Sequence, residues 1–440
     1  MKKLIPILLL TALLLSACAG SGSGDKQAAQ SESPAVDTAE TLASDHTVIT
    51  LNGESAEIRG GGARDEGASV TISAAGTYEI TGRGDKAIVV DTGDDPMDVT
   101  VVLNNASVTC LSGPALHVRQ AGQFRLQLAG QNSLVSGTED MLQNLDPEAS
   151  GGALYSEDDM DIEGDGSLTV CGYLNNGIAC KKDLDLNSGS ITVLAANNGV
   201  KGNNSVQVKG GTLSVSAWGD GIKATTLDKE GKGYVEISGG TVIVESWSDG
   251  VQAATELRIT GGSLSVTARG DGVENSSKAL KAGSLILLSD GLVSLNSQED
   301  ALRCSEGSVS ITGGTLDILC LSDGIQAGEK DSGLGDVTVS GGDLRISAGN
   351  RAIKAQGSFS VTGGSIRALC GSEKQNPATG SPCLLCLISG AQGDSLQIGD
   401  LESIQARQDY KCLLLVREGL NAGAQITVSN GSGSITATVK

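Results

Sequence analysis

Val208–Ala224 reads VKGGTLSVSAWGDGIKA, and the same pattern returns along the chain. Further copies read ISGGTVIVESWSDGVQA at Ile237–Ala253, ITGGSLSVTARGDGVEN at Ile259–Asn275 and ITGGTLDILCLSDGIQA at Ile311–Ala327. Each copy has a Gly-Gly pair, an alternating strand, a polar corner that ends in Asp-Gly, and a short strand that usually ends in a small residue. Self-similarity of this kind indicates a repeat architecture.

The corner glycine, or the alanine that replaces it, marks the register of the repeat. It recurs at Gly177, Gly199, Gly221, Gly250, Gly272, Ala301, Gly324 and Ala352. The basic spacing is about 22 residues, and longer gaps contain insertions near Thr225–Gly233, Ser276–Gly283 and Gly328–Gly335. A unit this short is half a propeller blade. We therefore predict an all-β fold, a single-stranded right-handed parallel β-helix in which each repeat is one coil of three short strands.

The chain divides into three parts on composition and pattern. Residues 1–17 combine a basic start with a short apolar run, as in a signal peptide. Leu15-Ser16-Ala17-Cys18 matches a bacterial lipobox, so we predict lipidation of Cys18; an ordinary signal peptide followed by a chance cysteine is the alternative. Residues 18–46 are small and polar and predict a flexible tether. Residues 47–440 carry the predicted β-helix, with irregular cap coils at 47–153, regular coils at 154–370 and closing coils at 371–440.

The expected elements are less regular at both ends of this domain. At the N-terminal end we expect strands at Ser69–Ile80, Met97–Leu103 and Phe124–Leu128, and a long loop at Gly130–Leu154. At the C-terminal end we expect a loop at Ser372–Pro382, followed by strands at Leu384–Ile388, Leu401–Ala406, Cys412–Val416 and Ile435–Val439.

The charge of the chain narrows the class of partner. The formal net charge is −21, and only two histidines occur in 440 residues. Nucleic acid and an anionic membrane surface are poor partners for such a chain, because both require a basic footprint. We expect a monomer that contacts the bacterial membrane only through its N-terminal lipid, with the domain facing outward.

The corner aspartates form the first candidate site. In a regular stack they lie one above the next at about 4.8 Å, so their charges repel unless cations lie between them. Ca²⁺ prefers such oxygen-rich surroundings. Alternatively, Asp-Gly serves only as a favourable turn pair, a role that asparagine fills equally well. The five aspartates are Asp220, Asp249, Asp271, Asp300 and Asp323.

A second acidic cluster opens the regular coils. Glu157, Asp158, Asp159 and Asp161 are followed one coil later by Asp183. We predict Asp158, Asp159 and Asp183 as further Ca²⁺ ligands, with a solvated run of charge as the alternative.

The two tryptophans of the chain occupy one column of the repeat. Trp218 and Trp247 precede their corner aspartates by two residues on neighbouring coils, and Arg269 follows on the next. Because sugar rings pack on indole faces, we predict a carbohydrate contact here, with Tyr173 as a weaker member two coils earlier. The alternative is that the two indoles simply stack on each other.

The cysteines resemble core residues more than a disulfide framework. Cys180 and Cys304 replace the small residue of one column, and Cys320 and Cys370 replace alanine in another, so we expect unpaired thiols there. A pair among Cys383, Cys386 and Cys412 stays open.

Several segments together resemble a known family. They are Val48–Gly53 (VITLNG), Gly76–Gly82 (GTYEITG), Asp98–Asn105 (DVTVVLNN), Leu154–Met160 (LYSEDDM) and the Gly-Gly/Asp-Gly coils. Their order is similar to that of the bacterial carbohydrate-binding domain-containing β-helix proteins. The resemblance implies a pectate-lyase-like shape, bound Ca²⁺, and affinity for cellulose or acidic, pectin-type polymers. This chain departs from the pattern where Asn176, Asn198 and Arg351 stand at the corner.

Three classes of function follow from these features. We expect a cell-surface lipoprotein that binds a polysaccharide, assisted by Ca²⁺, without catalysis. The alternatives are a surface adhesin or structural scaffold, and a polysaccharide lyase or hydrolase. Arg269 and Arg303 are candidate bases for a lyase, but no combination of nucleophile and base is evident in the sequence.

Overall fold

The computed structural model describes residues 46–143, 151–270, 276–330 and 333–440. The predicted signal peptide, Cys18 and nearly all of the tether lie outside these residues. Within the described residues, no helix is both long and apolar enough to cross a membrane.

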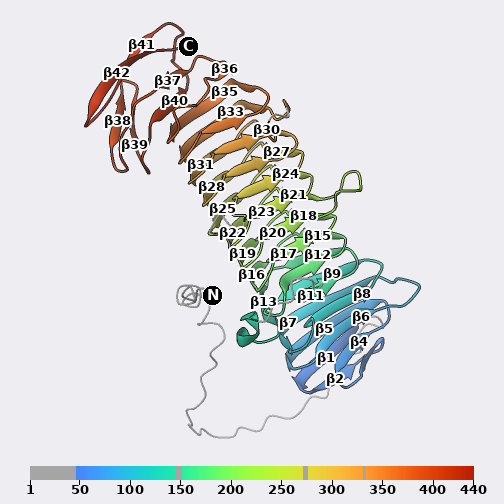
Figure 1. The fold of residues 1–440 in the computed structure, drawn as a ribbon. Helices are drawn as coiled ribbons and strands as arrows, with labels where there is room; N and C mark the ends of the chain where they lie inside the picture. The colour runs from blue at the N-terminus through green and yellow to red at the C-terminus, as the bar shows by residue number, and fades with distance from the viewer. Residues whose placement is uncertain (1–45, 144–150, 271–275, 331–332) are drawn as a thin grey trace, which may run out of the picture. The chain divides into compact units, whose positions relative to one another are not determined.

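Three ladders of parallel strands run along the domain. In one coil, β20 (Ile222–Ala224), β21 (Tyr234–Ile237) and β22 (Thr241–Ser246) follow one another. They pair in parallel, in that order, with β23 (Val251–Ala253), β24 (Glu256–Ile259) and β25 (Ser263–Ala268) of the next coil. Figure 1 shows this arrangement repeating from the green to the orange strands. The described chain is therefore an all-β, solenoid-like fold in which each coil adds one strand to each ladder.

The first ladder is a sheet of thirteen strands. Besides β20 and β23, it contains β3 (Ala63–Asp65), β4 (Ser69–Ile72), β6 (Ala87–Asp91), β8 (Leu116–Gln120), β11 (Gly152–Ser156), β14 (Asn176–Cys180), β17 (Val200–Gly202), β26 (Leu280–Ala282), β29 (Leu302–Cys304), β32 (Ile325–Ala327) and β34 (Ile353–Ala355).

Long strands near the two ends join the other two ladders into a sheet of 25 strands. The ladder of β21 and β24 also contains β9 (Phe124–Ala129), β12 (Met160–Gly164), β15 (Asp183–Leu186), β18 (Ser205–Val208), β27 (Leu285–Leu288) and β30 (Ser308–Ile311). The other adds β10 (Gln131–Ser136), β13 (Ser167–Gly172), β16 (Ser190–Ala195), β19 (Thr212–Ala217), β28 (Leu292–Ser297) and β31 (Thr315–Cys320). The long strands are β1 (His46–Gly53), β5 (Gly76–Gly84), β7 (Val99–Cys110), β33 (Val337–Ala348) and β35 (Phe359–Cys370).

The repeat produces coils because its glycines bend the chain and its alternating residues fill the interior. Gly211, the second glycine of the Gly-Gly pair, has φ of +74°, and a Cβ there would lie 2.3 Å from the carbonyl oxygen of Gly189. Only glycine fits that turn without strain. The strand that follows buries Leu213 and Val215, as predicted. Their equivalents pair in register in the neighbouring coils, so the core is a continuous stack of aliphatic side chains.

The register predicted for the coil after β25 is wrong. Leu280, not Val273, pairs with Val251, so Lys278-Ala279 takes the corner position that the sequence assigned to Asp271-Gly272. The insertion therefore precedes the corner rather than following it. The physical reason is that each short strand ends in a small buried residue. Ala282 fits between Ala253 and Cys304, where the alternative register would place asparagine.

The N-terminal cap contains more strand than predicted. Ser69–Ile80 is divided between β4 and β5, and the expected loop at Gly130–Leu154 includes β10 and the start of β11. β10 alternates buried and exposed residues and pairs with β7 and β13. A short 3-10 helix, η2 (Glu139–Gln143), follows it, and β2 (Ser55–Arg59) pairs antiparallel with β1.

The C-terminal segment does not form closing coils. β37 (Leu384–Cys386) and β40 (Cys412–Val416) pair antiparallel, and β40 also pairs antiparallel with β35 of the last coil. Beyond them, β39 (Glu402–Gln405), β38 (Ser395–Ile398), β41 (Gln425–Asn430) and β42 (Gly433–Thr438) form a four-stranded antiparallel sheet around a second apolar core. These strands lie together in red in Figure 1. The sequence predicted neither β38 nor β41.

All three ladders of the last coil have partners beyond it. β36 (Thr379–Gly380) and β40 pair with β35. At the end of the thirteen-stranded sheet, the buried side chain of Gln375 bonds to both the N–H and the carbonyl of Ile353, at 3.1 Å each. An amide side chain thus takes the place of the next strand and closes an edge that would otherwise invite pairing with another chain.

Candidate functional site: columns of side chains at the corner of the coil

The predicted corner aspartates are buried and bound to the backbone. Asp249 is 1% exposed and Asp323 is 1% exposed. One oxygen of each accepts the N–H of the corner residue in the next coil, and Asp249 Oδ1 accepts that of Lys278 at 3.0 Å. The same bond is made by Asn176, Asn198, Asp220 and Asp300. We call this set the corner column: Asn176, Asn198, Asp220, Asp249, Lys278, Asp300, Asp323 and Arg351.

The second carboxylate oxygen in this column faces a cation of the protein. Lys223 Nζ lies 2.6 Å from Asp220, Lys281 Nζ 2.9 Å from Asp249, and Lys354 Nζ 3.0 Å from Asp323. Ca²⁺ requires six to eight oxygen ligands and open lone pairs. One oxygen of each of these aspartates bonds to a backbone N–H and the other to an ammonium group, which would repel a second cation. The corner column therefore does not fit a calcium ladder, and its geometry supports the turn role that asparagine shares.

Asp300 differs from the other corner aspartates. Its nearest cation is Arg303, whose Nη1 lies 3.9 Å away, and the same guanidinium bonds to Glu329 at 2.6 Å. Burial raises the pKa of Asp300 above its ordinary value, because hydrogen bonds from Ser322 and the Asp323 amide offset only part of the desolvation. Asp271, the remaining predicted ligand, lies outside the described residues.

The carboxylates of the second acidic cluster also contact different partners and do not converge on one point. Asp158 accepts the N–H of Ala121 at 3.0 Å and pairs with Lys182. Asp159 accepts the N–H of Asp183 at 3.0 Å. Asp183 in turn binds Ser205 at 2.6 Å and Lys232 at 2.7 Å. Among the described residues, no group of three or more acidic, histidine or cysteine side chains is arranged to hold a metal ion.

The tryptophans lie where the sequence placed them. Ladder hydrogen bonds put Trp218, Trp247 and Arg269 at one position of three consecutive coils, just after β19, β22 and β25. Tyr173 holds the same position two coils before Trp218. We call these residues, with Ala196, Gln298 and Leu321 at the same position, the aromatic column. Because the coils repeat at about 4.8 Å, the column is a row along the stack.

The tryptophan pair is partly self-contacting and partly open. The ring centroids are 5.6 Å apart and the ring planes are inclined by 44°. The indoles therefore contact each other, as the alternative interpretation proposed, but they do not form one flat platform. Trp218 remains 42% exposed, and Ile243 on the adjacent outer face of β22 is 44% exposed. Arg269 pairs with Glu245 at 3.3 Å beside them.

A third column was not predicted from the sequence. The middle residue of each short strand in the thirteen-stranded sheet points outward, and cations occupy most of these positions. The members are Lys201, Lys223, Gln252, Lys281, Arg303, Gln326 and Lys354, which we call the basic column. The repeated triplets Ile-Lys-Ala and Leu-Lys-Ala were the available signal.

The basic column mainly neutralises the corner column. Lys201 is the exception, because its coil has Asn198 at the corner and no ion pair to it is found within the described ranges. Burial, followed by repulsion from Lys223, lowers the pKa of Lys201. This arrangement explains how a chain of charge −21 can carry a row of cations along one sheet.

At the same outward position, His117 of β8 and Tyr155 of β11 form an aromatic cluster, which Ala179 of β14 separates from Lys201 of the basic column. His117 stacks on Tyr155 with centroids 4.9 Å apart, and its Nε2 lies 3.1 Å from Glu157. Burial lowers the pKa of His117, although Glu157 opposes the shift. For Glu157 itself, burial raises the pKa, but hydrogen bonds from Lys181 and His117 outweigh it, so the pKa lies below its usual value.

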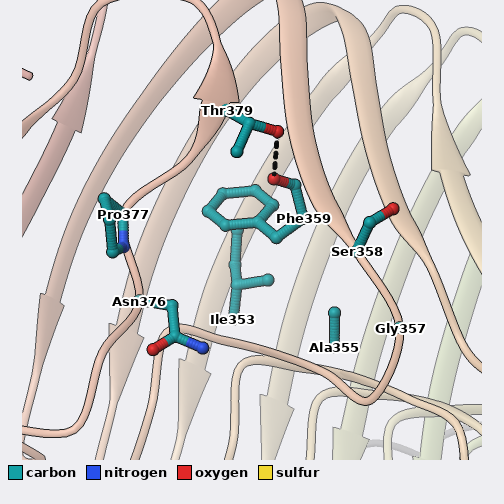
Figure 2. A pocket seen from close by; sticks show the side chains of 8 residues that line it. All are labelled: Ile353, Ala355, Gly357, Ser358, Phe359, Asn376, Pro377 and Thr379. Carbon is teal, nitrogen blue, oxygen red and sulfur yellow. Dashed lines mark hydrogen bonds between the residues drawn. The ribbon is translucent and has the colours of Figure 1, made fainter. Parts of the chain in front are cut away.

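A small hollow lies at the last strand of the thirteen-stranded sheet (Figure 2). Its volume is about 190 Å³, below the range usual for ligand pockets. Ile353, Phe359 and Pro377 line it, and Thr379 Oγ1 closes one side by donating to the carbonyl of Phe359 at 2.9 Å. No charged side chain is among its lining residues.

The fold and these columns define a class: a β-solenoid whose chemistry is displayed in rows along its surface. A model of the carbohydrate-binding domain-containing protein family matches residues 66–320 and 305–440. The chain belongs to this carbohydrate-binding domain-containing protein family, and the resemblance seen in the sequence is confirmed.

One relative and one solved structure are similar to the chain. A "Carbohydrate-binding domain-containing protein" of Acetivibrio thermocellus (strain ATCC 27405) is 31% identical over 129 residues, which are 29% of this chain and 45% of the relative. The match thus spans less than half of that relative. A solved structure of the "polysaccharide lyase-like protein from C. thermocellum, Gadolinium derivative" is 30% identical, covering 51% of this chain and 92% of that chain, with a TM-score of 0.48.

Proposed function

We propose that this protein is a lipid-anchored, outward-facing surface protein that binds a polysaccharide without catalysis, and that the Trp218–Trp247 pair contacts the sugar. Family membership supports the carbohydrate ligand. The proposal includes a single-stranded, right-handed path for the coils. It includes no calcium, because Asp220, Asp249 and Asp323 each bond to a backbone N–H and to a lysine.

The observation that carries the proposal is the exposure of Trp218 next to its partner. Exposing 42% of an indole to water is unfavourable, and a ligand that covers the ring removes this cost. Covering it buries roughly 100 Å² and is worth about 2 kcal/mol. Because the two ring planes are inclined by 44°, each indole can contact a different sugar of a polymer that follows the row.

The surroundings suit a polymer rather than a single enclosed sugar. In register along the neighbouring strands, the outward positions carry Ser214, then the exposed Ile243, then the short polar side chains of Ser265 and Ser294. Arg269 and Glu245 add charged hydrogen-bonding groups at the tryptophans. Cellulose and acidic, pectin-type polymers are the two candidate ligands, and the structure contains features for both: indoles for neutral ring faces and Lys201 for an acid group.

The test compares binding by the full chain to insoluble cellulose and to soluble polygalacturonate. The double variant Trp218→Ala/Trp247→Ala should weaken binding at least about 10-fold, equivalent to about 1.4 kcal/mol. Leu321→Ala is the matched control, because Leu321 is 59% exposed at the same position of a later coil. It should bind like the unaltered chain.

Three results would redirect the assignment. Unchanged binding by the double variant would remove the tryptophan site. Release of an unsaturated uronate product would establish a lyase instead. Binding to proteins or cells without any glycan signal would support the adhesin or scaffold alternative.

A further inference from the structure

Two buried cysteines face each other where the C-terminal segment meets the last coil. Cys370 is the last residue of β35, and Cys412 is the first residue of β40. The antiparallel register places them directly opposite each other, and neither side chain is exposed. Cα atoms of directly opposed residues lie about 4.5–5.5 Å apart, within the range that a disulfide spans. Both belong to the same apolar core.

The register also separates Cys412 from Cys386 and from Cys383, two partners that the sequence left open. Cys386 opposes Leu413 and lies with it in the second core, on the other face of β40 from Cys412. Cys383 precedes Leu384, which opposes Leu415, so it is several residues along the ladder from Cys412. Cys320 is two coils from Cys370, as predicted.

We propose that Cys370 and Cys412 are a disulfide-forming site that joins the C-terminal segment covalently to the solenoid. In the structure Cys370 is a buried, free thiol, as the sequence predicted, and the proposal adds a reaction for it. Such a bond would enclose residues 371–411, which contain β36 to β39. It would hold β40 against β35 and keep the edge of the last coil covered.

The chemistry of the pair favours the reaction. A hydrogen bond from Cys412 holds the pKa of Cys370 below its ordinary value, although burial opposes the shift. The same bond, together with burial, raises the pKa of Cys412. Cys370 is thus the nucleophile of the pair.

The oxidant in this step is a small disulfide. The Cys370 thiolate attacks one sulfur of that disulfide, breaks its S–S bond and forms a mixed disulfide; the thiolate that leaves takes up the proton that Cys370 lost. Cys412 then loses its proton, its sulfur attacks Sγ of Cys370, and the second thiol leaves with the transferred proton. Two protein thiols are oxidised and one disulfide is reduced. An exported domain, as predicted from residues 1–18, lies outside the reducing cytosol.

The test uses the full chain refolded with a mixture of oxidised and reduced glutathione. After alkylation and non-reducing proteolysis, mass spectrometry should find one linked peptide pair, containing Cys370 and Cys412. The remaining cysteines of the described domain should be alkylated. Recovery of both Cys370 and Cys412 in alkylated form, or a random set of linked pairs, would overturn the proposal.

Two variants separate the cross-link from a general effect of removing a buried thiol. Cys412→Ser should abolish the linked peptide, whereas Cys320→Ser, at the position of Cys370 two coils earlier, should retain it. A reductant should lower the unfolding midpoint of the oxidised chain by a few degrees and leave that of Cys412→Ser unchanged. If the reductant changed the unfolding midpoints of Cys412→Ser and Cys320→Ser equally, the assignment would be contradicted.

Discussion

Replacing Asp249 tests whether the corner aspartates serve the backbone rather than a metal. Its Oδ1 accepts the N–H of Lys278 at 3.0 Å and the hydroxyl of Ser276 at 2.6 Å, and its Oδ2 lies 2.9 Å from Lys281 Nζ. Asp249→Ala removes all three partners. Asp249→Asn keeps an acceptor for the first two, as Asn198 does for Asp220, and loses only the ion pair.

The magnitudes follow from these contacts. Leaving the Lys278 N–H unsatisfied costs about 1–3 kcal/mol, and the lost hydroxyl bond costs about 1 kcal/mol. The ion pair to Lys281, whose side chain is 29% exposed, adds about 1 kcal/mol. We expect Asp249→Ala to lower the free energy of unfolding by about 3–5 kcal/mol and Asp249→Asn by about 1 kcal/mol.

Thermal melting followed by circular dichroism measures the difference. The unfolding entropy of a chain this long is roughly 0.8 kcal/mol/K, so the alanine variant should melt about 4–6 °C lower and the asparagine variant about 1 °C lower. Asp228→Ala, at an exposed position in the insertion after β20, should be within about 0.5 kcal/mol of the unaltered chain. Equal losses for the alanine and asparagine variants would refute the backbone role, because only the charge would then matter.

Two further predictions concern Asp300 and calcium. Burial raises the pKa of Asp300, so its ionised form costs stability in the folded state, and that cost grows as pH rises above 3.8 through the raised pKa. Asp300→Asn keeps the acceptor for the Asp323 N–H, and its unfolding midpoint relative to the unaltered chain should therefore rise across that window; a constant difference between the two melting curves would contradict the burial argument. Adding Ca²⁺ after EGTA treatment should leave the midpoint unchanged, whereas saturation at 100 times Kd of a real site would add about 2.7 kcal/mol, or about 3 °C here, and would restore the predicted calcium site.

The repeat was legible in the sequence because each coil repeats the same local chemistry. Gly-Gly specifies the bend at Gly211, and alternation specifies that Leu213 and Val215 are buried. Trp218 and Trp247 could be placed in one column although an insertion separates them, since each lies at the same distance from its own Gly-Gly pair and Asp-Gly corner. Where the spacing changed, counting failed: Asp271-Gly272 looks like a corner, but Lys278-Ala279 occupies it.

The ends of the domain could not be read in this way. β38, β41 and their neighbours pair antiparallel and lack the repeat, so their partners are not encoded by a spacing. The Gln375 side chain that closes the thirteen-stranded sheet likewise depends on where the last coil ends.

For the candidate site, the sequence by itself determined which residues share a column wherever the repeat keeps its spacing, because stacking at a constant spacing converts alignment into position; at Asp271 it did not. Only the tertiary structure decided which way those columns face and what they touch. Asp220 points into the corner, where a backbone N–H and Lys223 satisfy it, while Trp218, two residues earlier, points out and remains open. The reason is physical: the direction of a side chain at a corner depends on the turn geometry of two successive coils. Likewise, Cys370 lies opposite Cys412 only because β40, which is not part of the repeat, pairs with β35.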